Sequence, residues 1–135
     1  MKPFFGVGMG MIAGAVLGAA AVTALQAQTK GPVYLVSEIT VSNPEAYAKE
    51  YAPKVQATIK AAGGRVIALG GSGGAQAGTV TGLQGDPPQR VAIQQWESAD
   101  ALKAWWNSAD YKAARAIGDK YAKFRIFTVD GVQLK

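Results

Sequence analysis

The chain has 135 residues, a net charge of +5, and neither cysteine nor histidine. The missing cysteines exclude disulfides and thiolate chemistry, and the missing histidines exclude axial-histidine haem binding, histidine-based zinc sites and Ser-His-Asp hydrolysis. Because the basic residues are spread along the chain without a recognised nucleic-acid-binding module, we expect no nucleic-acid partner, no metal and no cofactor.

Residues 1–27 are expected to form a signal peptide or an N-terminal membrane anchor. Lys2 is followed by an uncharged, largely apolar run over residues 4–25 and then by small residues, the pattern of an export signal. The run is also long enough to cross a bilayer, and its glycines recur at every fourth position, which lets membrane helices approach closely. A cleaved leader predicts a periplasmic or secreted protein, whereas a retained one predicts a domain anchored outside the cytoplasm through residues 4–25.

The domain itself is assigned to residues 33–132, after a polar linker over residues 28–32. Its first element is a strand over residues 33–41, which is rich in β-branched and aromatic side chains. A helix is expected next, because Asn43 can cap its first turn and Pro44 suits its first position.

Apolar residues step by four along this first helix and predict one buried stripe: Tyr47, Tyr51, Val55 and Ile59. Pro53 lies inside the stripe and predicts a kink or break near Tyr51-Ala52, because proline lacks the amide that a helix interior requires. Gly63-Gly64 then ends the helix, since glycine readily adopts the left-handed conformation of a C-terminal cap.

Further strands and two more helices follow. The strands are expected over residues 65–69, 90–96 and 123–129, with a short extension strand over residues 79–83. The glycine-rich connection over residues 70–78 lacks the Gly-Lys-Ser/Thr ending of a phosphate-binding loop. The helices are expected from Ser98 to Trp106 and, after a cap at Ser108, from Ala109 to about Tyr121.

This order, β-α-β-β-α-β with the second helix broken in two, predicts the ferredoxin-like plan of the α+β class. Such a domain has a four-stranded antiparallel sheet with helices on one face. The other face is left bare and has to be covered. Because pairing two sheets across a two-fold axis covers it economically, we expect a homodimer.

Several short motifs, taken in order, match a known family. They are Tyr47 and Tyr51, Ala62-Gly63-Gly64-Arg65, Gly70-Gly71, Leu83-Gln84-Gly85, the stretch from Arg90 through Trp96 to Ser98, and Ala104-Trp105-Trp106-Asn107-Ser108-Ala109-Asp110-Tyr111 with Arg115. Residues 33–132 thereby resemble the family called domain of unknown function 1330, in the dimeric α+β barrel superfamily. Gln84 and Gln95 depart from the pattern, because family members often carry glutamate there, so an acid function at these positions is not carried over.

The resemblance implies a dimeric α+β barrel with its site between the sheet and the helices. The family itself has no settled activity. Relatives in the superfamily include cofactor-independent oxygenases, lactone isomerases and haem-degrading enzymes. The resemblance therefore implies where a site would lie, but it implies neither a substrate nor a reaction.

The candidate ligand contacts are aromatic and polar side chains on the expected helices and at the end of one strand: Tyr47, Tyr51, Trp96, Trp105, Trp106, Ser108, Tyr111 and Arg115. Each also has a structural interpretation. The aromatic rings can fill the core and Ser108 can cap a helix. Arg115 can pair with Asp119, or it can hold a carboxylate or phosphate with its planar fork. No catalytic residue is assigned, because no paired carboxylates are visible.

Three functional hypotheses follow. The first is an exported, homodimeric domain that binds a small organic ligand, anionic if an arginine holds it, in an aromatic-lined pocket. The second is a cofactor-independent enzyme of the oxygenase or isomerase type. The third is a membrane-anchored structural or interaction module. A cavity reached by two or more polar side chains would favour the first two hypotheses over the third.

Overall fold

The computed structural model describes residues 31–73 and 77–133, which belong to one compact unit, Gly31–Lys135. The expected leader over residues 1–27 and most of the linker after it lie outside the described residues. Within the described ranges, no helix is both long and apolar enough to cross a membrane.

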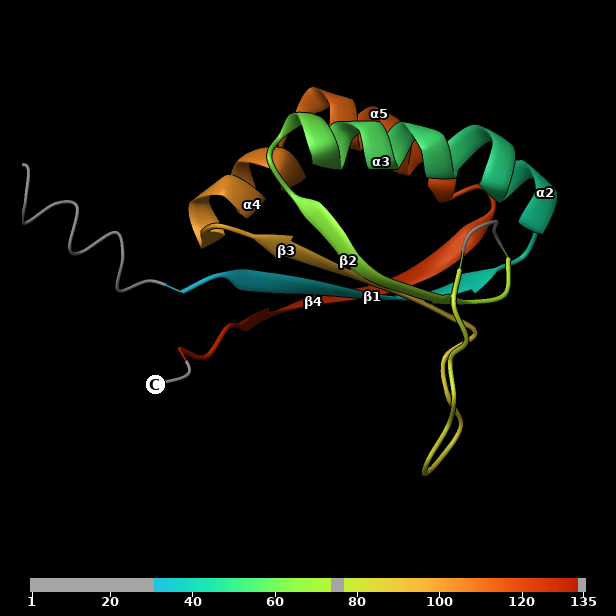
Figure 1. Ribbon diagram of the computed structural model, residues 1–135. Helices are drawn as coiled ribbons and strands as arrows, with labels where there is room; N and C mark the ends of the chain where they lie inside the picture. Colours follow the sequence, from blue (N-terminus) through green and yellow to red (C-terminus); the bar gives the residue numbers. More distant parts are fainter. Residues whose placement is uncertain (1–30, 74–76, 134–135) are drawn as a thin grey trace, which may run out of the picture. The chain divides into compact units, whose positions relative to one another are not determined.

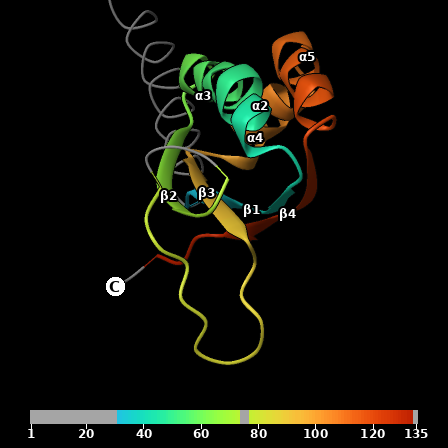
Figure 2. The same ribbon diagram turned by 90° about the vertical axis from the view of Figure 1, so that its right-hand side faces the viewer.

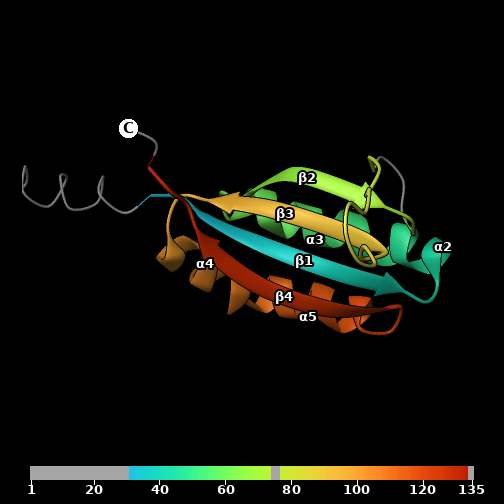
Figure 3. The same ribbon diagram turned by 90° about the horizontal axis from the view of Figure 1, so that it is seen from below.

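Four antiparallel strands form a sheet in the order β2-β3-β1-β4, and the helices cover one of its faces (Figures 1 and 3). The elements are β1 (Val33–Val41), α2 (Pro44–Ala46), η1 (Tyr47–Tyr51), α3 (Ala52–Ala61), β2 (Arg65–Gly71), β3 (Arg90–Trp96), α4 (Ala99–Trp106), α5 (Ala109–Gly118) and β4 (Ala122–Asp130). The expected α+β ferredoxin-like fold is confirmed, with its second helix divided into α4 and α5.

Side-chain alternation decides which face of the sheet each residue occupies. In β1, Val33, Leu35, Ser37 and Ile39 are buried on the covered face, while the residues that alternate with them point to the other face. Directly opposed residues of antiparallel strands point to the same face, so their partners in β3 also face the helices: Trp96, Gln94 and Arg90. The register thereby places two polar residues of β3 under the helical layer.

The first helix changes from π-helical to α-helical geometry near Pro53, where the sequence predicts a kink or a break. The segment η1 is π-helical, and α3 begins at Ala52 with Pro53 in its first turn. Oδ1 of Asn43 accepts the backbone amide of Ala46 at 3.2 Å, so the expected N-terminal cap is present as well. The helix is thus irregular at the position where a kink or break is predicted, near Tyr51-Ala52, but the chain stays helical through it.

Gly63 and Gly64 end α3 for two different reasons. Gly63 has a φ angle of 89°, the left-handed conformation that a helix cap of this kind needs. Gly64 instead lies against the ring of Trp96, because a Cβ atom on Gly64 would be 2.6 Å from Cζ2 of that ring. The second glycine is thus required by packing between distant parts of the chain.

Two sequence-based expectations are wrong in detail. Residues 79–83 form no strand, because Gly82 and Gly85 and the two prolines that follow favour turns. In the described part of the connection between β2 and β3, Gly78 forms an isolated bridge with Gly70, and residues 79–89 have no regular structure and project from the sheet on the side opposite the helices (Figures 1 and 2). The helix α5 ends at Gly118, because the amide of Tyr121 bonds to the Gly118 carbonyl at 3.0 Å and turns the chain toward β4.

Candidate functional site

A cavity of about 50 Å³ lies between the covered face of the sheet and the first helix. The sheet forms the floor of the cavity. Space remains above it because two small side chains lie opposite each other there, Ser37 of β1 and Ala92 of β3. Gly71 of β2 is opposite Arg90 of β3 and has no side chain. The space above this end of the sheet is therefore left to the arginine.

Two tyrosines at the ends of η1 form the roof of the cavity. Tyr47 and Tyr51 are 3% and 5% exposed, and their ring centroids lie 5.1 Å apart. Single π-helical turns of this kind are frequent at functional sites. Burial raises the pKa of both hydroxyls, so both phenols stay protonated at neutral pH and can donate hydrogen bonds.

Arg90 is the charged residue of the cavity wall. Its side chain and backbone together are only 2% exposed, and its guanidinium carbon lies 5.6 Å from the centroid of the Tyr47 ring. The Nε and Nη1 atoms are buried and have no hydrogen-bond partner among the described residues. None of the residues that line the cavity is acidic. The Tyr47 hydroxyl is a neutral hydrogen-bond partner of the Arg90 side chain. The positive charge of Arg90 therefore has no counter-ion among the described residues that line the cavity.

Ser37 and Gln94 complete the polar part of the wall, and both are buried. The indole Nε1 of Trp96 donates a hydrogen bond to Oε1 of Gln94 at 3.0 Å. This bond sets the orientation of the amide, so its NH₂ group is the part left to donate toward the cavity. The wall consequently presents one cation, three hydroxyls, the buried amide of Gln94 and, at the exposed side, the amide of Gln56.

Such a wall suits an acceptor that carries negative charge. A buried cation is costly unless it is paired, and its attraction for an anion is stronger where water is excluded. The lining residues include no carboxylate that could take a proton at neutral pH, and the described part of the chain has no group of three acidic residues that could hold a metal ion. The geometry thus supports anion binding more directly than acid–base chemistry.

Of the eight candidate contacts from the sequence, Tyr47 and Tyr51 line this cavity. Four others form an aromatic cluster away from its wall: Trp96, Trp105, Trp106 and Tyr111. The ring centroids of Trp105 and Tyr111 are 4.0 Å apart, and those of Trp96 and Trp105 are 5.1 Å apart. Trp96, Trp105 and Tyr111 belong to the buried core, whereas Trp106 is 36% exposed at the edge of the cluster.

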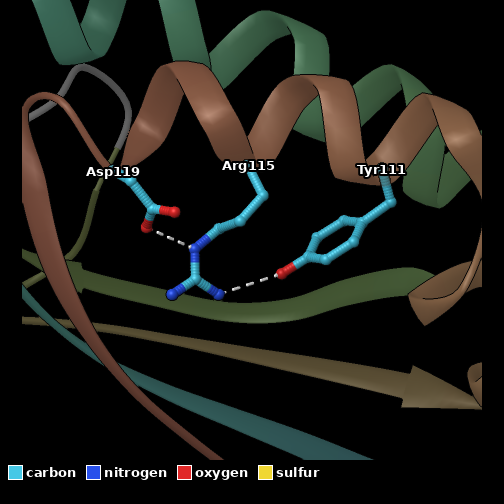
Figure 4. A network of polar contacts seen from close by, with 3 residues as sticks. All are labelled: Tyr111, Arg115 and Asp119. Atoms are coloured by element: carbon cyan, nitrogen blue, oxygen red, sulfur yellow. Dashed lines mark hydrogen bonds and ion pairs between the residues drawn. The ribbon is translucent and has the colours of Figure 1, made fainter.

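Arg115, unlike Arg90, has an acidic partner (Figure 4). Its Nε donates to Oδ1 of Asp119 at 2.7 Å, and its Nη1 donates to Oη of Tyr111 at 3.4 Å. Burial lowers the pKa of Arg115, but the bonds to Asp119 and Tyr111 outweigh burial and raise it. The guanidinium also borders a shallow surface depression that Trp106 and Tyr111 line. The pairing with Asp119 is the structural alternative that the sequence left open.

Ser108 occupies the cap of α5. Its Oγ accepts the backbone amide of Tyr111 at 3.2 Å and donates to the carbonyl oxygen of Trp105 at 2.6 Å. The hydroxyl therefore joins the end of α4 to the start of α5, and it does not line the cavity at Arg90.

Sequence reasoning missed Arg90, Ser37 and Gln94. A signal for them was present, because Arg90 and Gln94 alternate in phase with Trp96 along one strand. An apolar tryptophan at the end of such an alternation indicates that the polar residues in phase with it face the core. The same test in the first strand would have identified Ser37, which alternates with Leu35 and Ile39.

Comparisons with known proteins agree with this fold. A search of curated proteins finds no significant match. Among solved structures, the chain is similar to the RPA0582 protein of unknown function from Rhodopseudomonas palustris, with 16% identity, a TM-score of 0.59, and coverage of 83% of this chain and 93% of that one. It is also similar to SnoaB, a cofactor-independent oxygenase from Streptomyces nogalater, with 13% identity and a TM-score of 0.55. The match covers 77% of this chain and 96% of SnoaB.

Identities this low show a shared fold and nothing about activity. The sequence assigns the chain to a family, because residues 32–132 match one family model. The match spans the whole sheet and helical layer described above. The chain belongs to the family described as Domain of unknown function (DUF1330).

Proposed function

We propose that this protein is an exported, homodimeric domain that binds a small organic anion in the cavity at Arg90. The observation that carries the proposal is a guanidinium that is 2% exposed, has two unpartnered nitrogen atoms and faces a cavity without acidic side chains. Burying a charge without a partner costs several kcal/mol in proteins. An anionic ligand would supply the missing partner.

The roof and floor suit an organic ligand. The Tyr47 and Tyr51 rings provide apolar surface, and their hydroxyls, with Ser37 and Gln94, provide donors. Pockets of this composition, apolar with a few convergent polar groups, are the usual small-molecule sites. Tyr47 and Tyr51 thus remain proposed ligand contacts, whereas Trp96 is proposed to act indirectly by holding the amide of Gln94.

The test compares Arg90→Met with Arg115→Met. A ligand that binds only the folded protein raises its melting temperature, so acetate, propionate, benzoate and pyruvate are added to each protein, with chloride at equal ionic strength as the reference. We expect at least one carboxylate to stabilise the unmodified protein and Arg115→Met, but not Arg90→Met.

Other outcomes are equally informative. If Arg115→Met loses the response while Arg90→Met keeps it, the ligand occupies the surface depression at Trp106, Tyr111 and Arg115 instead. If no anion stabilises the unmodified protein, the binding function is wrong.

A cofactor-independent oxygenase or isomerase is the alternative, and it rests on the description of SnoaB, which is related to this chain in fold only. The lining residues offer no group that accepts a proton at neutral pH, because burial keeps Tyr47 and Tyr51 protonated. Oxygen consumption or isomerisation of a bound carboxylate, without any added cofactor and lost in Arg90→Met, would favour the enzyme over the binding protein.

The homodimer is supported by the sheet face that none of the helices in the described part of the chain covers (Figure 3). This bare face carries apolar residues of three adjacent strands: Tyr34, Val36, Ile93, Phe127 and Val129. Phe127 and Val129 are 40% and 50% exposed. Exposed apolar patches of this kind mark interaction sites, and a second copy would offer a matching face across a two-fold axis.

Export is supported by the pattern of residues 1–27, which carry a basic start and a long apolar run. Fractionation of the native host, followed by mass spectrometry, tests it. We expect a soluble periplasmic protein that begins near Leu25 or Gln28. Recovery of the intact N-terminus in the membrane fraction would favour the membrane-anchored module, whose leader is retained.

A further inference from the structure

We infer that the cavity selects a 2-oxo monocarboxylate: a ligand with one negative charge, a neighbouring carbonyl oxygen and no hydrogen-bond donor beside them. The inference rests on the anion site proposed at Arg90 and adds the chemical class of its ligand. Three features of the wall carry it, namely its single charge, its surplus of donors and its small volume.

The charge of the wall matches one negative charge. Arg90 is the one ionisable cation that lines the cavity, and no lysine or acidic residue accompanies it there. A carboxylate cancels this charge and fits the planar fork of the guanidinium. A phosphate dianion would leave one uncompensated negative charge in a buried site, which is unfavourable. The cavity should therefore prefer a monoanion.

The donors of the wall outnumber the acceptors of a simple carboxylate. Arg90 contributes two unpartnered nitrogen atoms, and Gln94 contributes the NH₂ group that its bond to Trp96 leaves free. The protonated hydroxyls of Tyr47 and Tyr51 can add to these. A carbonyl oxygen at carbon 2 accepts from the donors that a carboxylate leaves unused. An ammonium group at the same carbon would place a second cation beside Arg90.

The volume limits the length of the ligand. About 50 Å³ holds roughly three to five water-sized positions, which suits a carboxylate, a carbonyl and a short chain. Gln56 is exposed and Val66 is 39% exposed, and both line the cavity, so its opening lies between α3 and β2. A longer substituent would have to leave through this opening.

The experiment uses ligands of matched shape. Pyruvate and isobutyrate have the same number of non-hydrogen atoms and the same charge, but only pyruvate has the carbonyl acceptor. Titration calorimetry at neutral pH and constant ionic strength measures both against the full chain, with L-alanine and inorganic phosphate as further probes. We expect pyruvate to bind about tenfold more tightly than isobutyrate, as one to two net hydrogen bonds would provide, and L-alanine and phosphate to bind more weakly than either.

Two variants test the anion site and the ligand class separately. Arg90→Met should abolish binding of both carboxylates, whereas Gln94→Leu should reduce the preference for pyruvate and leave the affinity for isobutyrate within about twofold. If neither carboxylate binds, or if binding survives in Arg90→Met, the anion site itself is refuted. If both bind through Arg90 but pyruvate has no advantage, or if L-alanine or phosphate binds as tightly, the ligand class alone is wrong. The comparison of ligands on the unmodified protein decides this even if Gln94→Leu does not fold.

Discussion

Arg90 and Arg115 are chemically identical, yet their surroundings assign them opposite effects on stability. The Arg90 guanidinium is buried without a counter-ion, whereas Arg115 bonds to Asp119 and Tyr111 and covers the Phe124 ring at 4.3 Å. A buried donor without a partner retains its full desolvation cost. A site that binds an anion has to accept this cost in the absence of its ligand.

At this residue scale we predict that Arg90→Met raises the free energy of unfolding of the ligand-free protein by about 1–3 kcal/mol, because it removes an unpaired buried charge. Arg115→Met should lower it, by up to about 1 kcal/mol, because a partly exposed ion pair is weak. Urea denaturation monitored by tryptophan fluorescence measures both. A loss of stability in Arg90→Met would mean that the arginine is satisfied in a way that the cavity does not reveal, and would weaken the proposal of an anion site.

At the scale of elements, the second helix of the ferredoxin-like plan is interrupted at Asn107-Ser108. The interruption is stable because Ser108 makes two hydrogen bonds, one to each helix. It also lets α5 take its own direction, so that Tyr111 packs against Trp105 at a centroid distance of 4.0 Å. The aromatic cluster thus depends on the cap.

We predict that Ser108→Ala lowers the free energy of unfolding by about 1–2 kcal/mol, because the cap and the bond to the Trp105 carbonyl are both lost. Ser98→Ala is the matched control: Ser98 caps α4 through one bond to Ala101 at 3.1 Å, so its loss should cost less. Chemical denaturation compares the two. Carboxylate affinity should be unchanged in Ser108→Ala, and a clear loss of affinity would return Ser108 to the list of ligand contacts.

At the scale of the whole molecule, the helices cover one face of the sheet and leave the other bare (Figures 1 and 2). Val36 lies between Ile93 and Phe127 on the bare face, so apolar side chains are continuous across three strands. The site at Arg90 lies on the opposite face. The proposed dimer and the proposed ligand site would therefore use different surfaces of one sheet.

We predict that Phe127→Lys converts the proposed dimer to a monomer, because it places a charge within the apolar face that the dimer would bury. Val66→Lys makes the same kind of change on the covered face, at the edge strand β2, and should leave the dimer intact. Sedimentation equilibrium at micromolar concentration measures both variants. A stable monomer in the unmodified protein would refute the homodimer.

The sequence by itself determined the order and nature of the elements. The cap at Asn43, the change of helix geometry before Pro53 and the glycine at position 63 act through the backbone of their own segment. Such signals need only a few neighbouring residues, and they are readable before any tertiary contact is known. The extension strand over residues 79–83 failed for the complementary reason, because a strand requires a partner that only the folded chain can supply.

The tertiary structure alone decided which polar residues share a site. Arg90, Ser37 and Tyr47 come from β3, β1 and η1, and they meet because strand register sets Arg90 opposite Gly71 and Ser37 opposite Ala92. Arg115 lies on α5 and does not line this cavity, although its sequence context is the more conspicuous of the two. Arg115 is paired by Tyr111 and Asp119, each four positions away on the same helix, so the sequence could suggest that pairing. The lack of an acidic partner for Arg90 depends instead on which residues from distant parts of the chain surround it, and a buried charge without such a partner is costly.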